Sequence, residues 1–143
     1  MQKNVFFDLT RVVTQWRKLL NRKVTDTRIT QAQWIALLYL QRIGEGITQR
    51  DLAWHLAIKN PTLVTLLDAL AENDLIERRV SREDHRVRHL HLTEQGTTFM
   101  QEINRSTDEL REALFEGIAE KDLQAALRTM EKVLENSRSL DKH

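Results

Sequence analysis

The sequence predicts a mainly helical protein that carries one small β-hairpin. Apolar residues recur at helical spacing over most of the 143-residue chain, and only four Gly and one Pro interrupt them. The apolar period changes to two near residues 75–92, where strands are expected. With 41% apolar and 30% charged residues, the composition is that of an ordinary globular domain. We therefore expect residues 1–143 to form a single domain.

Two helices are expected at the start of the chain. Residues 5–24 show a wide apolar stripe, which predicts an amphipathic helix. The next helix is expected to begin at Thr30, whose spacing to Gln33 is that of a capping box. Gly44 and Gly46 predict its end.

Two further helices follow after a short gap. Thr48 and Asp51 have the spacing of a helix cap and open a short helix. A fourth helix is expected at about residues 60–72, with Asn60 as its N-cap and Pro61 at the first helical position.

The remaining elements are a hairpin and two long helices. Leu90 and Leu92 alternate with histidines, which is the period of a strand, and residues 81–87 connect this strand to the preceding one. From Thr93 onward the spacing is helical again, with a break expected at Gly117. The predicted fold is therefore a winged helix-turn-helix at residues 30–93, flanked by N- and C-terminal helices at residues 1–24 and 94–143.

This arrangement predicts contact with duplex DNA. The helix at 60–72 would enter the major groove N-terminus first, and its N–H groups would attract phosphate. Positive charge is concentrated on the hairpin although the whole chain has a net charge of only +1. Arg86, at the hairpin tip, is the candidate for the minor groove, and Asp84 is expected to orient an arginine rather than to touch DNA. The side chains expected to meet DNA are Lys59, Asn60, Pro61, Thr62, Thr65, Arg82, His85, Arg86 and Arg88.

Other interpretations of these features remain open. A charged hairpin is often only a solvated surface, and a near-neutral winged helix also suits a protein–protein interaction module. His85, His89 and His91 lie near one another, but no Cys and no clear carboxylate accompany them, so phosphate contact is favoured over a metal site. No metal or cofactor is expected.

The sequence resembles the MarR family of bacterial regulators, and especially its SlyA branch. Asp84-His85-Arg86 followed by Leu92-Thr93 and Gly96 matches the wing signature of the family, and residues 63–70 and 73–78 resemble its recognition helix and the link into the wing. Residues 8–17 and 30–34 resemble the opening helices of the SlyA branch. Thr65 and Leu38 differ from the family, which often has an arginine at the first position and, in SlyA-like members, a histidine at the second.

The resemblance implies a homodimer whose two chain ends intertwine and which binds a pseudo-palindromic operator near a promoter. The apolar stripes of the terminal helices independently favour burial between two chains. The resemblance also implies a small aromatic carboxylate as effector. Its candidate site residues are Arg11, Trp16, Arg17, Trp34 and Leu38, although the two tryptophans also suit an ordinary core.

Sequence patterns also limit the other function classes. The chain contains no glycine-rich phosphate loop, no H-E-x-x-H and no G-x-S-x-G motif, so an enzyme is not expected. It contains no Cys, no signal peptide pattern and no long apolar run, which suits a cytoplasmic protein. The resemblance implies that this is the bacterial cytoplasm and that the protein acts at the nucleoid.

Overall fold

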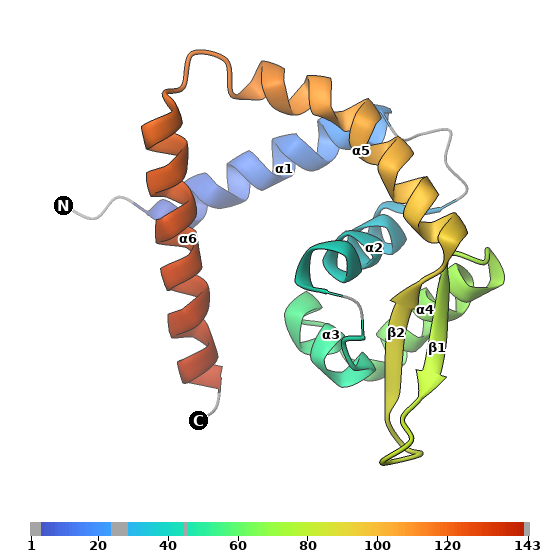
Figure 1. Cartoon of the computed structure of the whole chain (residues 1–143). Coiled ribbons are helices and arrows are strands. Elements are labelled where there is room, and N and C mark those ends of the chain that lie inside the picture. Colours follow the sequence, from blue (N-terminus) through green and yellow to red (C-terminus); the bar gives the residue numbers. More distant parts are fainter. Residues whose placement is uncertain (1–3, 24–28, 45, 142–143) are drawn as a thin grey trace. The chain divides into compact units, whose positions relative to one another are not determined.

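The computed structural model describes residues 4–23, 29–44 and 46–141, which form six helices and one antiparallel hairpin (Figure 1). The elements are α1 (Val5–Lys23), α2 (Gln31–Ile43), α3 (Gln49–Leu56), α4 (Asn60–Glu72), β1 (Ile76–Val80), β2 (Arg88–Leu92), α5 (Glu94–Leu114) and α6 (Glu120–Asp141). The mainly helical fold with a small β-hairpin is thus confirmed. The chain divides into two compact units, one ending at Asp108 and the other beginning at Glu109, and α5 runs through the division.

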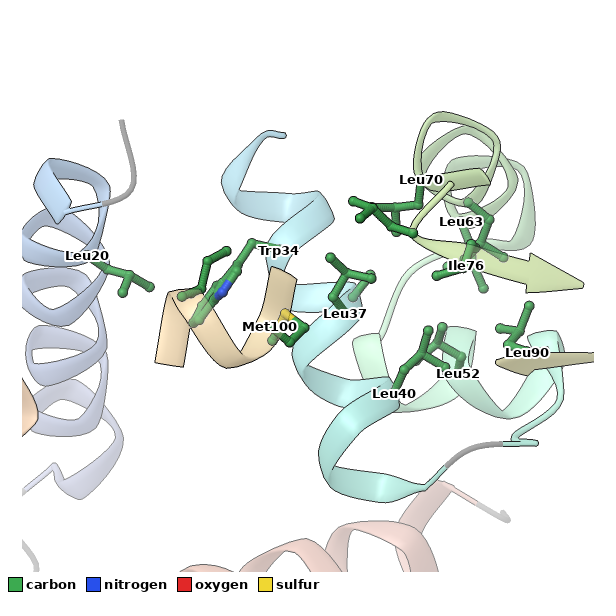
Figure 2. Packing of buried hydrophobic residues seen from close by; sticks show 14 residues of the cluster. Leu20, Trp34, Leu37, Leu40, Leu52, Leu63, Leu70, Ile76, Leu90 and Met100 are labelled. Atoms are coloured by element: carbon green, nitrogen blue, oxygen red, sulfur yellow. The ribbon is translucent and has the colours of Figure 1, made fainter. Parts of the chain in front are cut away.

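The first unit has one continuous apolar core. Helix α2 supplies four of its buried side chains, and α1, α3, α4, the hairpin and α5 contribute the others. Figure 2 shows Trp34 on the side of α2 toward Leu20 and Met100, while Leu37 and Leu40 lie toward the helix-turn-helix and hairpin. The core residues are Leu20, Trp34, Ala36, Leu37, Leu40, Leu52, Leu63, Leu67, Leu70, Leu75, Ile76, Leu90, Met100 and Ile103.

The expected caps fix two of the helix starts. The Thr30 side chain accepts the N–H of Gln33, and the Gln33 side chain accepts the N–H of Thr30, which completes the capping box of α2. Thr48 caps α3 by accepting the N–H of Asp51. Toward the C-terminus, α5 ends at Leu114, and Gly117 follows in the turn after it with a φ of +81°.

The second unit has little core of its own. Helix α6 contains no buried residue, and several large apolar side chains on it and on the turn before it are exposed. Among the described residues, no helix has both the length and the apolar character that spanning a membrane requires.

Candidate nucleic-acid interface

Helices α3 and α4 meet through a tight turn at residues 57–59. Ala57 adopts the left-handed conformation (φ +55°), and its N–H returns to the carbonyl oxygens at the end of α3. The N–H of Ile58 also bonds the carbonyl of Ala53, at 3.1 Å. These bonds end α3 at Leu56 and let α4 start at Asn60, after three intervening residues, in a new direction.

The start of α4 differs from the sequence prediction. Asn60 was expected to be the N-cap, but the N-cap is Lys59, and α4 begins at Asn60 with Pro61 in its first turn. Lys59 provides no side-chain cap within the described part of the chain. Lys59, Asn60, Pro61 and Thr62 are all exposed, so polar groups and backbone N–H groups of the first turn face solvent.

The Asn60 side chain is instead held by α3. Its Oδ1 accepts a hydrogen bond from Nε2 of Gln49 at 3.1 Å. Asn60 itself lies inside the helix, because Lys59 before it has the extended backbone of an N-cap (φ −77°, ψ 151°). One turn further along α4, the Thr65 hydroxyl donates to the carbonyl of Pro61 at 3.2 Å, and Thr65 is exposed on the same helix.

The wing consists of β1, β2 and the connection between them. Ile76 pairs with Leu92 and Val80 with Arg88, in antiparallel register. Beyond the last pair, the N–H of Ser81 bonds the carbonyl of Val87 at 3.0 Å, so the connection is itself closed by backbone hydrogen bonds. The exposed side chains expected to meet DNA therefore project from an ordered turn.

Asp84 and Arg86 form the tip of the wing. Oδ1 of Asp84 accepts the backbone N–H of Arg86 at 3.0 Å and its Nε at 3.2 Å. These two bonds, the backbone one foremost, lower the pKa of the Asp84 carboxyl below its usual 3.8. The Arg86 side chain is 91% exposed, so the guanidinium is oriented by the carboxylate yet presents its other N–H groups outward.

Arg82, His85 and Arg88 surround this tip and are all exposed. The guanidinium of Arg88 donates to the carbonyl of His85 at 2.9 Å, which ties the start of β2 to the tip. The structure thus brings the wing residues that the sequence suggested onto one projecting loop. The role of each in binding DNA stays a prediction.

Two contacts that sequence patterns did not suggest fix the wing on the helix-turn-helix. Arg78 of β1 forms an ion pair with Asp68 of α4 at 2.8 Å. On the other side, the loop before α3 pairs with β2 through hydrogen bonds between Leu90 and residues 46–47, and Nδ1 of His89 contacts the carbonyl oxygen of Gly46 at 2.8 Å. Only the tertiary fold brings these partners together, across 10 and 43 residues of sequence.

The candidate effector residues fall into two groups. Trp34 is buried in the core, and Trp16 and Leu38 pack partly buried against it. Arg11 and Arg17 are exposed on α1, and Arg11 pairs with Asp8 at 3.6 Å. The Nε1 of Trp34 is buried and has no hydrogen-bond partner within the described residues, which sequence patterns do not reveal.

The histidines of the wing do not assemble a metal centre in the described chain, where no group of three or more His, Asp or Glu residues has a suitable arrangement. His89 contacts the carbonyl oxygen of Gly46, whereas His85 lies at the wing tip, so the two histidines lie in different surroundings.

Comparison with known proteins identifies the relatives of this chain. A family model described as the MarR family matches residues 29–87, which span the helix-turn-helix and most of the wing. The transcriptional regulator PA3341 is 30% identical, with a TM-score of 0.80 over 92% of this chain and 96% of that one.

Two other solved structures share the fold. The transcriptional repressor CouR, solved bound to a 23-mer DNA duplex, is 25% identical, with a TM-score of 0.76 over 91% of this chain and 92% of that one. Wild-type MarR from E. coli is 22% identical with a TM-score of 0.75, covering 94% of this chain and 99% of that one, and supports the fold alone. The family model, the PA3341 match and the winged-helix geometry agree: the chain belongs to the MarR family of transcriptional regulators.

Proposed function

We propose that this protein binds a pseudo-palindromic site in double-stranded DNA as a homodimer and thereby regulates transcription at the bacterial nucleoid. The observation that carries the proposal is the Asp84–Arg86 tip, a highly exposed guanidinium held by a carboxylate on a wing that is tied to α4. Members of the family are transcription regulators rather than enzymes.

The major groove is the proposed place for the start of α4. Its first turn is exposed and has no side-chain cap, so backbone N–H groups remain available for phosphate oxygens. Lys59 adds a positive charge, and Asn60, Thr62 and Thr65 add short polar groups that fit base edges or phosphates.

The minor groove is the proposed place for the wing tip. A narrow minor groove concentrates negative potential and attracts an inserted arginine. Because Asp84 restrains the Arg86 side chain before binding, less side-chain entropy is lost when the guanidinium enters the groove. Arg82 and Arg88 then lie near the flanking phosphates.

Dimer formation is supported by exposed apolar side chains at both ends of the chain. Six of them lie on α1 and are 37–67% exposed, and eight lie from residue 114 onward and are 43–77% exposed. Such an excess of exposed apolar surface marks an interaction site, and a twofold dimer would present two copies of α4 to half-sites about one DNA turn apart. The residues are Val5, Phe6, Phe7, Leu9, Val12, Val13, Leu114, Phe115, Ile118, Leu127, Met130, Val133, Leu134 and Leu140.

An aromatic carboxylate effector is supported by Trp34. A buried N–H without an acceptor is unfavourable by about 1–3 kcal/mol, and a carboxylate oxygen would satisfy it. Trp16 offers an aromatic face in the same cluster, and Arg11 or Arg17 on α1 offers a countercharge.

Titration of salicylate by calorimetry into the wild type and into Trp34→Phe tests this role of Trp34, because Phe keeps a ring but removes the N–H. Equal binding by both proteins, or binding by neither at millimolar salicylate, would exclude this role of Trp34.

DNA binding is tested with Arg86→Ala and, as control, Arg105→Ala on the exposed face of α5. After selection of bound sites from random duplexes, binding of the wild type should weaken steeply with salt. Arg86→Ala removes one cation per protomer, so the slope of log K against log salt should become less steep by about 2 for a dimer. Arg105→Ala should keep the wild-type slope. If the wild type selects no duplex, the proposal fails and the alternative, a protein–protein interaction module, is favoured.

A further inference from the structure

We propose that Gln49 is a positioning residue for base recognition: it holds the Asn60 amide with its oxygen toward α3 and its amino group toward DNA, so that Asn60 prefers guanine to adenine. This inference rests on the proposed DNA binding by α4. It concerns a hydrogen bond between two helices, Nε2 of Gln49 to Oδ1 of Asn60 at 3.1 Å.

Gln49 is well placed to hold another side chain. It is the first residue of α3, directly after Thr48, which caps the helix with its hydroxyl. The backbone of Thr48 also forms a bridge with His89 of β2. The Gln49 backbone therefore lies between the bridge of Thr48 to the wing and the remainder of α3. From there its side chain reaches Asn60, the first residue of α4.

The bond decides which half of the Asn60 amide is left for a ligand. An asparagine amide has one oxygen, which accepts, and one amino group, which donates. Gln49 turns the oxygen toward α3, so the amino group is the half of the exposed Asn60 amide that lies away from Gln49 and can meet a base edge. Rotating the Asn60 amide alone would bring the two amino groups of Gln49 and Asn60 together, which is unfavourable once the groove has excluded water, so only a rotation of both amides would turn the Asn60 oxygen outward.

Base edges distinguish the two orientations. An asparagine usually binds adenine in a bidentate manner, accepting from N6 and donating to N7, and for this it needs both halves of the amide. A side chain that only donates fits guanine, whose N7 and O6 both accept. Held by Gln49, Asn60 should therefore favour guanine and leave the N6 amino group of adenine without an acceptor.

The decisive variant is Gln49→Glu. A carboxylate only accepts, so it would reverse the contact, take the amino group of Asn60 and turn the Asn60 oxygen toward the groove. The substitution is nearly isosteric, and an acidic residue in the first turn of a helix is favourable, so folding should be preserved. Gln49→Met is the matched control, because it keeps the length of the side chain but removes the hydrogen bond.

The experiment compares duplexes that differ at one base pair. Sites bound by the wild type are first selected from random duplexes, and the position at which Asn60→Ala loses base discrimination is identified. Each protein is then titrated with two duplexes that carry guanine or adenine at that position, and the ratio of the two dissociation constants is recorded. The added negative charge of Gln49→Glu weakens binding to both duplexes alike and cancels in this ratio.

We expect the wild type to prefer guanine by about fivefold or more, the lower range of a specific contact between a side chain and a base. Gln49→Glu should prefer adenine, and Gln49→Met, in which the Asn60 amide can rotate freely, should lose the preference for guanine. If the wild type selects a site but Gln49→Glu keeps its ratio, or if the wild type prefers adenine, this inference is overturned while DNA binding stands. If the wild type selects no site, both proposals fail together.

Discussion

Gly96 lies in the first turn of α5, where the helix passes the backbone that leads into the wing, and replacing it with Ala tests this packing. A Cβ added at Gly96 would lie 2.0 Å from the carbonyl oxygen of Leu75 and 3.0 Å from its carbonyl carbon. Gly96 is buried and lies within a helix, so the obstacle is the neighbouring backbone and not the conformation of the glycine itself. Relief of the contact requires α5 to move by about 1 Å from residue 75.

The size of the destabilisation follows from the hydrogen bonds that such a movement disturbs. The N–H of Thr93 bonds the carbonyl of Leu75 at 3.1 Å, and the Thr93 hydroxyl donates to the carbonyl of Asp74. Weakening two hydrogen bonds loses about 1–2 kcal/mol, and overpacking adds about 1–3 kcal/mol. Ala regains about 0.5–1 kcal/mol over Gly within a helix. The net loss in the free energy of unfolding is therefore about 1–4.5 kcal/mol, with its centre at about 2–3 kcal/mol.

Thermal unfolding at a fixed protein concentration measures this loss. For a chain of this length, about 2–3 kcal/mol corresponds to a fall in Tm of roughly 5–10 °C. Thr98→Ala is the matched control, because Thr98 is exposed two residues later in α5 and gains helix propensity without a clash. A Gly96→Ala protein that melts at or above the wild-type temperature would show that α5 does not pass the Leu75 carbonyl in this way.

Three further predictions concern the wing. Asp84→Ala should weaken operator binding almost as much as Arg86→Ala, measured by fluorescence anisotropy, because the guanidinium loses the carboxylate that orients it. Arg78→Ala should lower Tm by only a few degrees, since the partners in the ion pair with Asp68 are 28% and 54% exposed, yet it should weaken operator binding by loosening the wing on α4. Because the pKa of Asp84 is lowered, the stability it contributes is fully present above about pH 3.8 and is lost only as the pH falls through the lower folded value, so an NMR titration of the carboxyl should show a midpoint below 3.8. In Arg86→Ala that midpoint should rise only part of the way, because the larger cause is the backbone N–H, which Ala retains.

Elements governed by local rules could be predicted from the sequence. Thr30 and Gln33 cap α2 as their spacing predicts, and Thr48 caps α3, because caps depend on residues three positions apart. The alternation around Leu90 located β2 because one face of that strand packs on the core. The mainly helical fold with one hairpin followed from these local signals.

Contacts between distant segments could not be predicted in the same way. Asn60 has a good side chain for an N-cap, and residue type alone favours it there, but in the fold Lys59 has the extended backbone of the N-cap. The Asn60 oxygen instead bonds Gln49, 11 residues away. The ion pair of Asp68 with Arg78 and the contact of His89 with Gly46 also depend on how helices and strands cross. The helical spacing of apolar residues predicts Trp34 in the core, where the structure has it. That its Nε1 has no partner among the described residues is visible only once the core is assembled.

The total charge of the chain gives these distant contacts a particular importance. With 22 basic and 21 acidic residues, the protein as a whole has little long-range attraction for DNA. A strongly basic protein binds any duplex through many phosphate contacts, and small errors in docking matter little to its affinity. In the proposed complex the affinity comes from a few groups on α4 and the wing that engage together, so it depends on the distance between them. The ion pair of Asp68 with Arg78 and the contact of His89 with Gly46 fix that distance, and their loss should reduce binding to the operator more than binding to random DNA.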